Sequence, residues 1–375
     1  MDAKKEDRIV NIRIARSSFV RQLRSKTKAK QRRKSGGVFI SKFQAVGAGS
    51  TSWNGIDLIV PELMCLDTNY EETVEFVHAL RRCALDQRRP VRLIFDNAKT
   101  IKASALLLLL AEMHRCRIVR GKHLVTGTYP PNQKLERMLC AMGFFDILNV
   151  KNRIAVNQEY PMNYIKFATA QRLKEHQARQ LRNDLLGDKI SMGMMPRKKL
   201  QTAITEAMLN AIQHAYPKGA SKSHPGRNRW WLTGTYNRKT KNLVITFCDL
   251  GVGIPATVTK LYLMEKIRGI FSLLPGIQVS DGQMIMAAMK LGRTSTGREG
   301  RGKGLNDLRK FIDHANGGEL KIFSKRGSYT YTAGGTETYK NYQQSLGGTL
   351  IKWSVPIANV TDWTGDEDAS DEEGN

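Results

Sequence analysis

The stretch "NLVITFCDLGVGIP", residues 242–255, decides the fold of the second half of this chain. It begins with apolar and β-branched residues, which predict a buried strand, and this run ends at Asp249. Gly251 and Gly253 follow directly. A carboxylate at a strand end can accept a hydrogen bond from an adenine amino group, and glycines let a flat base approach the backbone. A plain turn after a strand has the same pattern, so two other stretches must be considered with it.

The first of these is "RKKLQTAITEAMLNAIQHAY", residues 197–216, whose apolar residues recur at helical spacing. Glu206 and Asn210 are four residues apart and therefore share one face of the predicted helix. A carboxylate can deprotonate an attacking hydroxyl, and an amide oxygen is a suitable ligand for magnesium. Surface helices often carry both residue types. However, Asn is a mediocre helix former, and its place in an apolar patch favours a functional role.

The second is "GREGRGKGLNDL", residues 297–308. Gly300, Gly302 and Gly304 alternate before a predicted helix, and the free N–H groups at a helix start bind phosphate. Lys303 adds positive charge. The spacing imitates a P-loop, but no Ser or Thr follows the lysine and no buried strand precedes the stretch. We therefore predict either a phosphate loop of another kind or a flexible loop.

In order and context, these stretches and "GGTLIKWSVP", residues 347–356, resemble the GHKL ATPase superfamily, which includes DNA gyrase, histidine kinases and MutL. The resemblance covers residues 196–356 and implies that the chain binds ATP and Mg²⁺. It implies that Asp249, Gly251, Gly253 and Thr349 bind the adenine base and that Asn210 binds magnesium. It also implies that Gly300, Gly302, Lys303 and Gly304 bind the phosphates and that residues 256–299 form a mobile lid.

"EAMLNAIQHAY" is most similar to the anti-sigma-factor serine kinases, and this implies that Glu206 is the base that activates an acceptor hydroxyl. Residues 38–150 alternate predicted strands and helices, the pattern of a small α/β domain with a largely parallel sheet. This order resembles a STAS domain, the fold of the antagonists that such kinases phosphorylate. Ser104 falls near the acceptor position, although the DSSG-type turn is absent. A plain helix cap is the alternative role for Ser104.

The predicted fold class is α/β (α+β), with a STAS-like α/β domain followed by a GHKL α/β sandwich ATPase domain. The predicted parts are a basic disordered arm (1–37), the STAS-like domain (38–150), a basic helical connector (151–195), the ATP-binding domain (196–360) and an acidic disordered tail (361–375).

The charge of the chain indicates a polyanionic partner. Its 60 Lys and Arg against 34 acids give +26, and the arm alone carries 13 basic and three acidic residues. No segment approaches the length of a membrane span and the N-terminus lacks a signal sequence, so we predict a cytoplasmic protein. The five cysteines form no CxxC pair, which argues against structural zinc.

Three functions follow from these observations. The first is an ATP-hydrolysing or serine-kinase-like regulatory protein, coupled to its own STAS-like domain or to another protein. The second is an ATP-gated clamp or switch that binds nucleic acid through the basic arm. The third is a non-catalytic ATP-binding module. GHKL proteins often dimerise, so a homodimer is also expected.

Overall fold

The computed structural model describes residues 55–121, 124–154, 162–171, 193–217, 229–294, 304–315 and 317–357. All of them belong to the second of the chain's two units, residues 45–375. The predicted arm and acidic tail lie outside the described residues. None of the helices in the described ranges is long and apolar enough to cross a membrane.

Residues 55–154, called here the front layer, form an α/β structure. Three parallel strands pair in the order β1-β3-β5, and β2 and β4 form a separate parallel pair. The strands are β1 (Ile56–Ile59), β2 (Leu63–Met64), β3 (Val91–Ile94), β4 (Thr100–Ile101) and β5 (Val125–Gly127); the helices are α2 (Tyr70–Arg81), its π-helical extension η1 (Arg82–Asp86), α3 (Ala103–Arg120), α4 (Gln133–Ala141) and α5 (Phe144–Leu148). The parallel pairing agrees with the sequence prediction.

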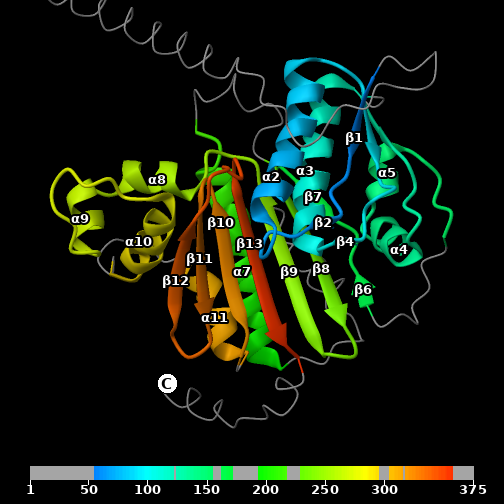
Figure 1. The fold of residues 1–375 in the computed structure, drawn as a ribbon. Coiled ribbons are helices and arrows are strands. Elements are labelled where there is room, and N and C mark those ends of the chain that lie inside the picture. The colour runs from blue at the N-terminus through cyan, green and yellow to red at the C-terminus, as the bar shows by residue number, and fades with distance from the viewer. Residues whose placement is uncertain are drawn as a thin grey trace, which may run out of the picture. The chain divides into compact units, whose positions relative to one another are not determined.

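The second half is built on an antiparallel sheet with the order β12-β11-β10-β13-β9-β8-β6, in which β7 also pairs with β8 (Figure 1). Its strands are β6 (Met162–Tyr164), β7 (Ala168–Ala170), β8 (Trp230–Asn237), β9 (Asn242–Asp249), β10 (Glu319–Ser324), β11 (Gly327–Thr332), β12 (Glu337–Asn341) and β13 (Thr349–Pro356). The central strands are rich in β-branched and aromatic residues, which suit a sheet that is covered on both faces.

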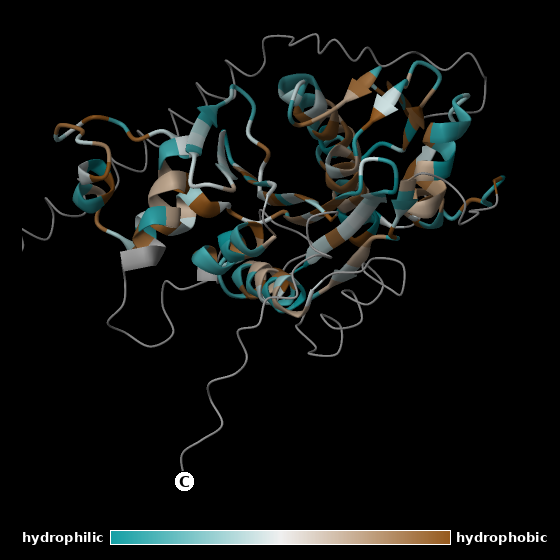
Figure 2. Ribbon diagram, turned by 90° about the horizontal axis from the view of Figure 1, so that it is seen from below, coloured by the Kyte–Doolittle hydropathy of each residue, from teal (hydrophilic) through white to brown (hydrophobic). Residues whose placement is uncertain are grey.

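One face of this sheet packs against α7 (Met194–Gln213), α10 (Asp281–Thr294) and α11 (Gly304–His314). The core between them includes Phe247 and Trp353 from the strands and Phe311 from α11, all at most 1% exposed. We call this the helix face. The helices of Figure 2 alternate between hydrophobic and hydrophilic colours, as expected for helices with one buried side.

The described part of the predicted lid consists of helices joined by turns and irregular segments. It contains α8 (Ile254–Leu261), α9 (Met264–Gly269) and α10. These helices have a small core of their own around Val258, Ile267 and Ala287.

The opposite face of the sheet is covered by the front layer. Helix α3 packs against β8 and β9 as well as against its own strand β5, so it lies between the two sheets. The indole of Trp231 donates a hydrogen bond to Nδ1 of His114 across this contact at 3.1 Å. We call this the docked face.

One element differs from the sequence prediction. Part of the predicted helical connector forms β7, because Ala168–Ala170 pair with Trp230–Leu232 and this pairing overrides the helical propensity of alanine. Residues 172–192 of the connector lie outside the described residues. Helix α10 continues through Gly292 to Thr294, since one glycine costs a helix only about 1 kcal/mol.

Candidate functional site

A row of four side chains crosses the helix face at one end of the sheet. Ser324, Thr349, Asp249 and Trp230 occupy paired positions on β10, β13, β9 and β8. Side chains alternate between the faces of a strand, so Asp249 lies on the same face as Phe247, which belongs to the core under α7 and α11. The predicted adenine-binding acid is therefore positioned by four strands rather than by one turn.

Asp249 is 5% exposed and interacts with neutral donors. Its carboxylate accepts a hydrogen bond from the backbone N–H of Gly251 at 2.8 Å, and Thr349 hydrogen-bonds to it through both its backbone and its hydroxyl. Burial raises the pKa of Asp249 to about 7, although these hydrogen bonds oppose the shift. The result is a buried carboxyl group that is ready to exchange a proton or to accept a further hydrogen bond near neutral pH.

The glycines after Asp249 are required by close contacts. A Cβ atom on Gly251 would lie 2.3 Å from the carbonyl oxygen of Ala215, which accepts a hydrogen bond from the next residue, Val252, at 2.8 Å. Gly253 has φ +83, and a Cβ there would lie 2.8 Å from Oγ of Ser324. The turn is thereby fixed to both the end of α7 and the end of β10.

Glu206 and Asn210 lie together on α7, as their spacing predicts. The Asn210 side-chain nitrogen donates a hydrogen bond to Oε1 of Glu206 at 2.9 Å. Burial raises the pKa of Glu206, the nearby carboxylate of Asp307 raises it further, and the Asn210 hydrogen bond partly opposes both effects. Asp307 lies in the first turn of α11, so this pair lies near the amino end of the helix that follows the glycine-rich stretch.

The glycine-rich stretch itself is described only at its end. Gly300, Gly302 and Lys303 lie outside the described residues, and Gly304 is the first residue of α11. The element before the stretch is helix α10 rather than a buried strand. This is not the strand–loop–helix order of a P-loop, in agreement with the sequence argument.

Ser104 is not brought to Glu206. It lies in the first turn of α3, is 4% exposed, and belongs to the helix that packs on the docked face. Glu206 lies on α7, across the sheet. In this arrangement the predicted phospho-acceptor and the predicted base are separated by the sheet, and the acceptor role of Ser104 stays a prediction.

Sequence reasoning missed three residues of the site. Ser324 accepts a hydrogen bond from Ile254 N–H at 2.9 Å and lies 3.2 Å from the Thr349 hydroxyl. The Tyr216 hydroxyl accepts from Leu250 N–H at 3.1 Å. It donates to the carbonyl of Arg229 at 2.8 Å, which ties the end of α7 to β8 and β9. The third residue is Asp307. Tyr216 is the last residue of the quoted stretch "EAMLNAIQHAY", so a sequence signal for it was present. Ser324 could be placed beside Thr349 only from the strand register.

The described residues fit ATP better than a protein-held metal centre. No group of three or more His, Cys, Asp or Glu in the described ranges could hold a metal ion. At one end of the site is a buried carboxyl that suits the amino group of a base. At the other is an amide–carboxylate pair close to the start of a helix. This division matches the two ends of a nucleotide.

Residues 195–356 match the family model described as histidine kinase-, DNA gyrase B-, and HSP90-like ATPase, which places an α/β GHKL-type ATPase domain in this part of the chain. The match begins in the second residue of α7 and ends with the last residue of β13. No curated protein matches the chain.

Proposed function

We propose that this chain is a regulatory ATPase, in which Mg²⁺-dependent ATP hydrolysis in the domain 195–356 is coupled to the front layer. The observation that carries the proposal is the row Ser324–Thr349–Asp249, which holds a buried carboxyl among neutral donors. An unpaired buried carboxyl is costly to a fold, and its retention is accounted for by a ligand that donates a hydrogen bond to it.

At the adenine end, the amino group of the base donates to Asp249. The carboxylate form is the stronger acceptor, so binding shifts Asp249 toward ionisation. The Thr349 hydroxyl, which already hydrogen-bonds to Asp249, would face the same edge of the base. Gly251 lets the turn pack closely against Ala215, and its N–H donates to the Asp249 carboxylate in that position.

At the phosphate end, Glu206 acts as the general base. It removes a proton from water as the water oxygen forms a bond to the terminal phosphorus and the bond to the ADP oxygen breaks. Its raised pKa makes it a stronger base than an exposed glutamate. The side-chain N–H of Asn210 donates a hydrogen bond to Glu206, so the amide oxygen of Asn210 is the atom that would bind Mg²⁺. The bound ion would neutralise phosphate charge.

The acceptor in this arrangement is water or a hydroxyl group of another molecule. The helix that carries Ser104 packs on the far side of the sheet, so autophosphorylation of Ser104 would require the front layer to leave the docked face. Hydrolysis requires no such rearrangement, and we therefore propose it as the primary activity.

The test separates binding from turnover. Asp249→Asn should weaken ATP binding about 10- to 100-fold, because it replaces a charge-assisted hydrogen bond with a poorer one. Glu206→Gln should bind ATP normally and lose about 10²- to 10⁴-fold in turnover. Binding is measured by calorimetry and turnover by phosphate release.

Glu62→Gln, on the exposed surface of the front layer, is the matched control and should behave like the unsubstituted chain. Normal turnover in Glu206→Gln would remove the assignment of the base. Unchanged affinity in Asp249→Asn would remove the adenine assignment.

A further inference from the structure

The amino end of α2 reaches the segment 342–348, called here the β12–β13 connection. Tyr70, the first residue of α2, is 4% exposed, and its ring stacks on that of Tyr342 with centroids 3.7 Å apart. Its hydroxyl lies 3.2 Å from the carbonyl oxygen of Lys325 and 3.4 Å from that of Gln344. Tyr70 therefore contacts both the end of β10 and the connection.

The next residue of α2 binds the backbone of the same connection. The carboxylate of Glu71 accepts hydrogen bonds from Gln343 N–H at 2.7 Å and from Gln344 N–H at 2.8 Å. Each oxygen has its own donor, and both bonds are assisted by the carboxylate charge. This places two successive peptide groups at a fixed position relative to α2.

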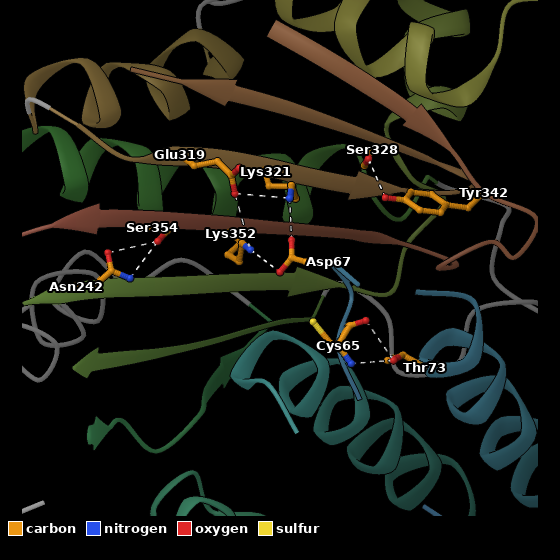
Figure 3. Close-up of polar contacts among 10 residues, drawn as sticks. All are labelled: Cys65, Asp67, Thr73, Asn242, Glu319, Lys321, Ser328, Tyr342, Lys352 and Ser354. Atoms are coloured by element: carbon orange, nitrogen blue, oxygen red, sulfur yellow. Dashed lines mark hydrogen bonds and ion pairs between the residues drawn. The ribbon is translucent and has the colours of Figure 1, made fainter. Parts of the chain in front are cut away.

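Asp67 fixes the same end of the front layer to the sheet. It forms ion pairs with Lys321 at 2.8 Å and with Lys352 at 2.7 Å, which are paired residues on β10 and β13 (Figure 3). Tyr342 is held in turn by a contact of 3.2 Å between its hydroxyl and Oγ of Ser328. The residues next to α2 and its partner Tyr342 are therefore themselves held to the sheet by polar contacts.

The connection leads directly to the adenine end of the site. Leu346 N–H donates to the Lys325 carbonyl at 2.7 Å, the same oxygen that Tyr70 approaches. The Ser324 hydroxyl donates to the carbonyl of Gly348 at 2.8 Å, and the next residue is Thr349. The connection that Tyr70 and Glu71 contact is therefore joined by backbone hydrogen bonds to the residues that carry the Ser324–Thr349–Asp249 row.

We propose that Tyr70 and Glu71 are positioning residues for nucleotide binding. They hold the β12–β13 connection so that Gly348 and Thr349 face Asp249 in the geometry that adenine requires. The inference rests on the proposed function, because it needs adenine at Asp249. By linkage, a nucleotide that favours this geometry strengthens the docking of α2 by the same factor by which docking strengthens nucleotide binding.

Two variants of the full chain test this. Glu71→Gln keeps the shape of the side chain and weakens both backbone hydrogen bonds, and Tyr70→Phe removes only the hydroxyl. The matched control is Glu75→Gln, one turn further along α2. We expect ADP affinity, measured by calorimetry, to fall about 3- to 10-fold in Glu71→Gln and about 3-fold in Tyr70→Phe, with Glu75→Gln within twofold of the unsubstituted chain.

Two readouts separate positioning from a merely structural role. AMP, which carries the adenine end with a single phosphate, should lose affinity by the same factor as ADP. In the unsubstituted chain, ADP should also slow hydrogen exchange at the Gln343 and Gln344 amides, and this slowing should be absent in Asp249→Asn.

The outcomes distinguish the two proposals. If the unsubstituted chain binds ADP and all three variants bind it equally, the positioning role is overturned and the ATPase assignment stands. Affinity loss for ADP with none for AMP would also overturn it, because the effect would then lie at the phosphate end. No ADP binding by the unsubstituted chain would overturn both.

Discussion

Asp249 and Asp67 lie against opposite faces of the same sheet, and their surroundings shift their pKa values in opposite directions. On the helix face, Asp249 is buried among neutral donors, and burial raises its pKa to about 7. On the docked face, burial of Asp67 also acts to raise the pKa, but Lys352 and Lys321 outweigh it and the pKa falls. The difference arises from the two cations beside Asp67 and from its greater exposure, since Asp67 is an exposed residue and Asp249 is buried.

This contrast separates two roles of a carboxyl group that lies against the sheet. Asp67 has its counter-charges within the protein, so its contacts are complete and join the front layer to the sheet. Asp249 has hydrogen bonds but no cation among its described contacts, which suits a group that receives a ligand. The helix face thus carries the proposed binding site, and the docked face carries the contact with the front layer.

The largest effect is expected from a substitution in the core of the helix face. Trp353 is fully buried, and its indole N–H donates to the carbonyl of Leu308 on α11 at 2.9 Å. Trp353→Ala should lower the free energy of unfolding by about 3–5 kcal/mol, because it leaves a cavity between the sheet and α11. Urea denaturation monitored by circular dichroism measures this.

Lys352→Ala is the control for this experiment, since it is the adjacent residue and points to the docked face. Asp67 keeps Lys321 in that variant, so the loss should stay near or below about 1 kcal/mol. Equal losses in the two variants would show that the faces do not differ in the way described.

Much of the helix face could be predicted from the sequence, because its signals are local. The strand that ends at Asp249 and the i, i+4 pair Glu206 and Asn210 are visible as composition and periodicity. Ser324 was not predictable as a site residue. Its place beside Thr349 depends on the register of β10 and β13, which are separated by two other strands in the sequence.

The docked face was less predictable, although one signal was present. The run "ALLLLLA", residues 105–111, is apolar on every side of its helix, and all of these residues are buried. A helix that is apolar all round must be covered all round, and α3 is covered by both sheets. The contacts of Asp67 and Tyr70 carry no such pattern, because charged and aromatic residues near a helix start are common on free surfaces.

The second prediction uses the pKa of Asp249. The folded protein holds this proton more tightly than the unfolded chain, so the stabilising contribution is complete below about pH 4 and is lost as pH rises through 7. The shift from 3.8 to about 7 corresponds to at most about 4 kcal/mol. Asp249→Asn mimics the protonated form, so it should match the unsubstituted chain near pH 4 and be more stable at pH 8.

Thermal unfolding across this pH range, without nucleotide, checks the sign. Gain of stability at high pH together with loss of ATP binding would identify Asp249 as a residue kept for its ligand at a cost to the fold. If Asp249→Asn were less stable than the unsubstituted chain at pH 8, the carboxyl would have a stabilising partner and the contrast with Asp67 would fail.

The smallest expected effect concerns Asp67. Asp67→Asn should lower the free energy of unfolding by about 1–2 kcal/mol at pH 7, because Lys321 and Lys352 then keep Glu319, at 3.6 and 3.9 Å, as their acidic partner within the described part of the chain. The pKa of Asp67 is lowered by folding, so its contribution is present above the unfolded pKa and is lost as pH falls through the folded value. The deficit of Asp67→Asn should therefore shrink in acid, whereas Asp249→Asn raises the free energy of unfolding at high pH.

Urea titrations at pH 7 and pH 3, with Glu319→Gln as the control, measure the deficit of Asp67→Asn. A deficit that grew in acid would mean that the two faces treat their carboxyl groups alike.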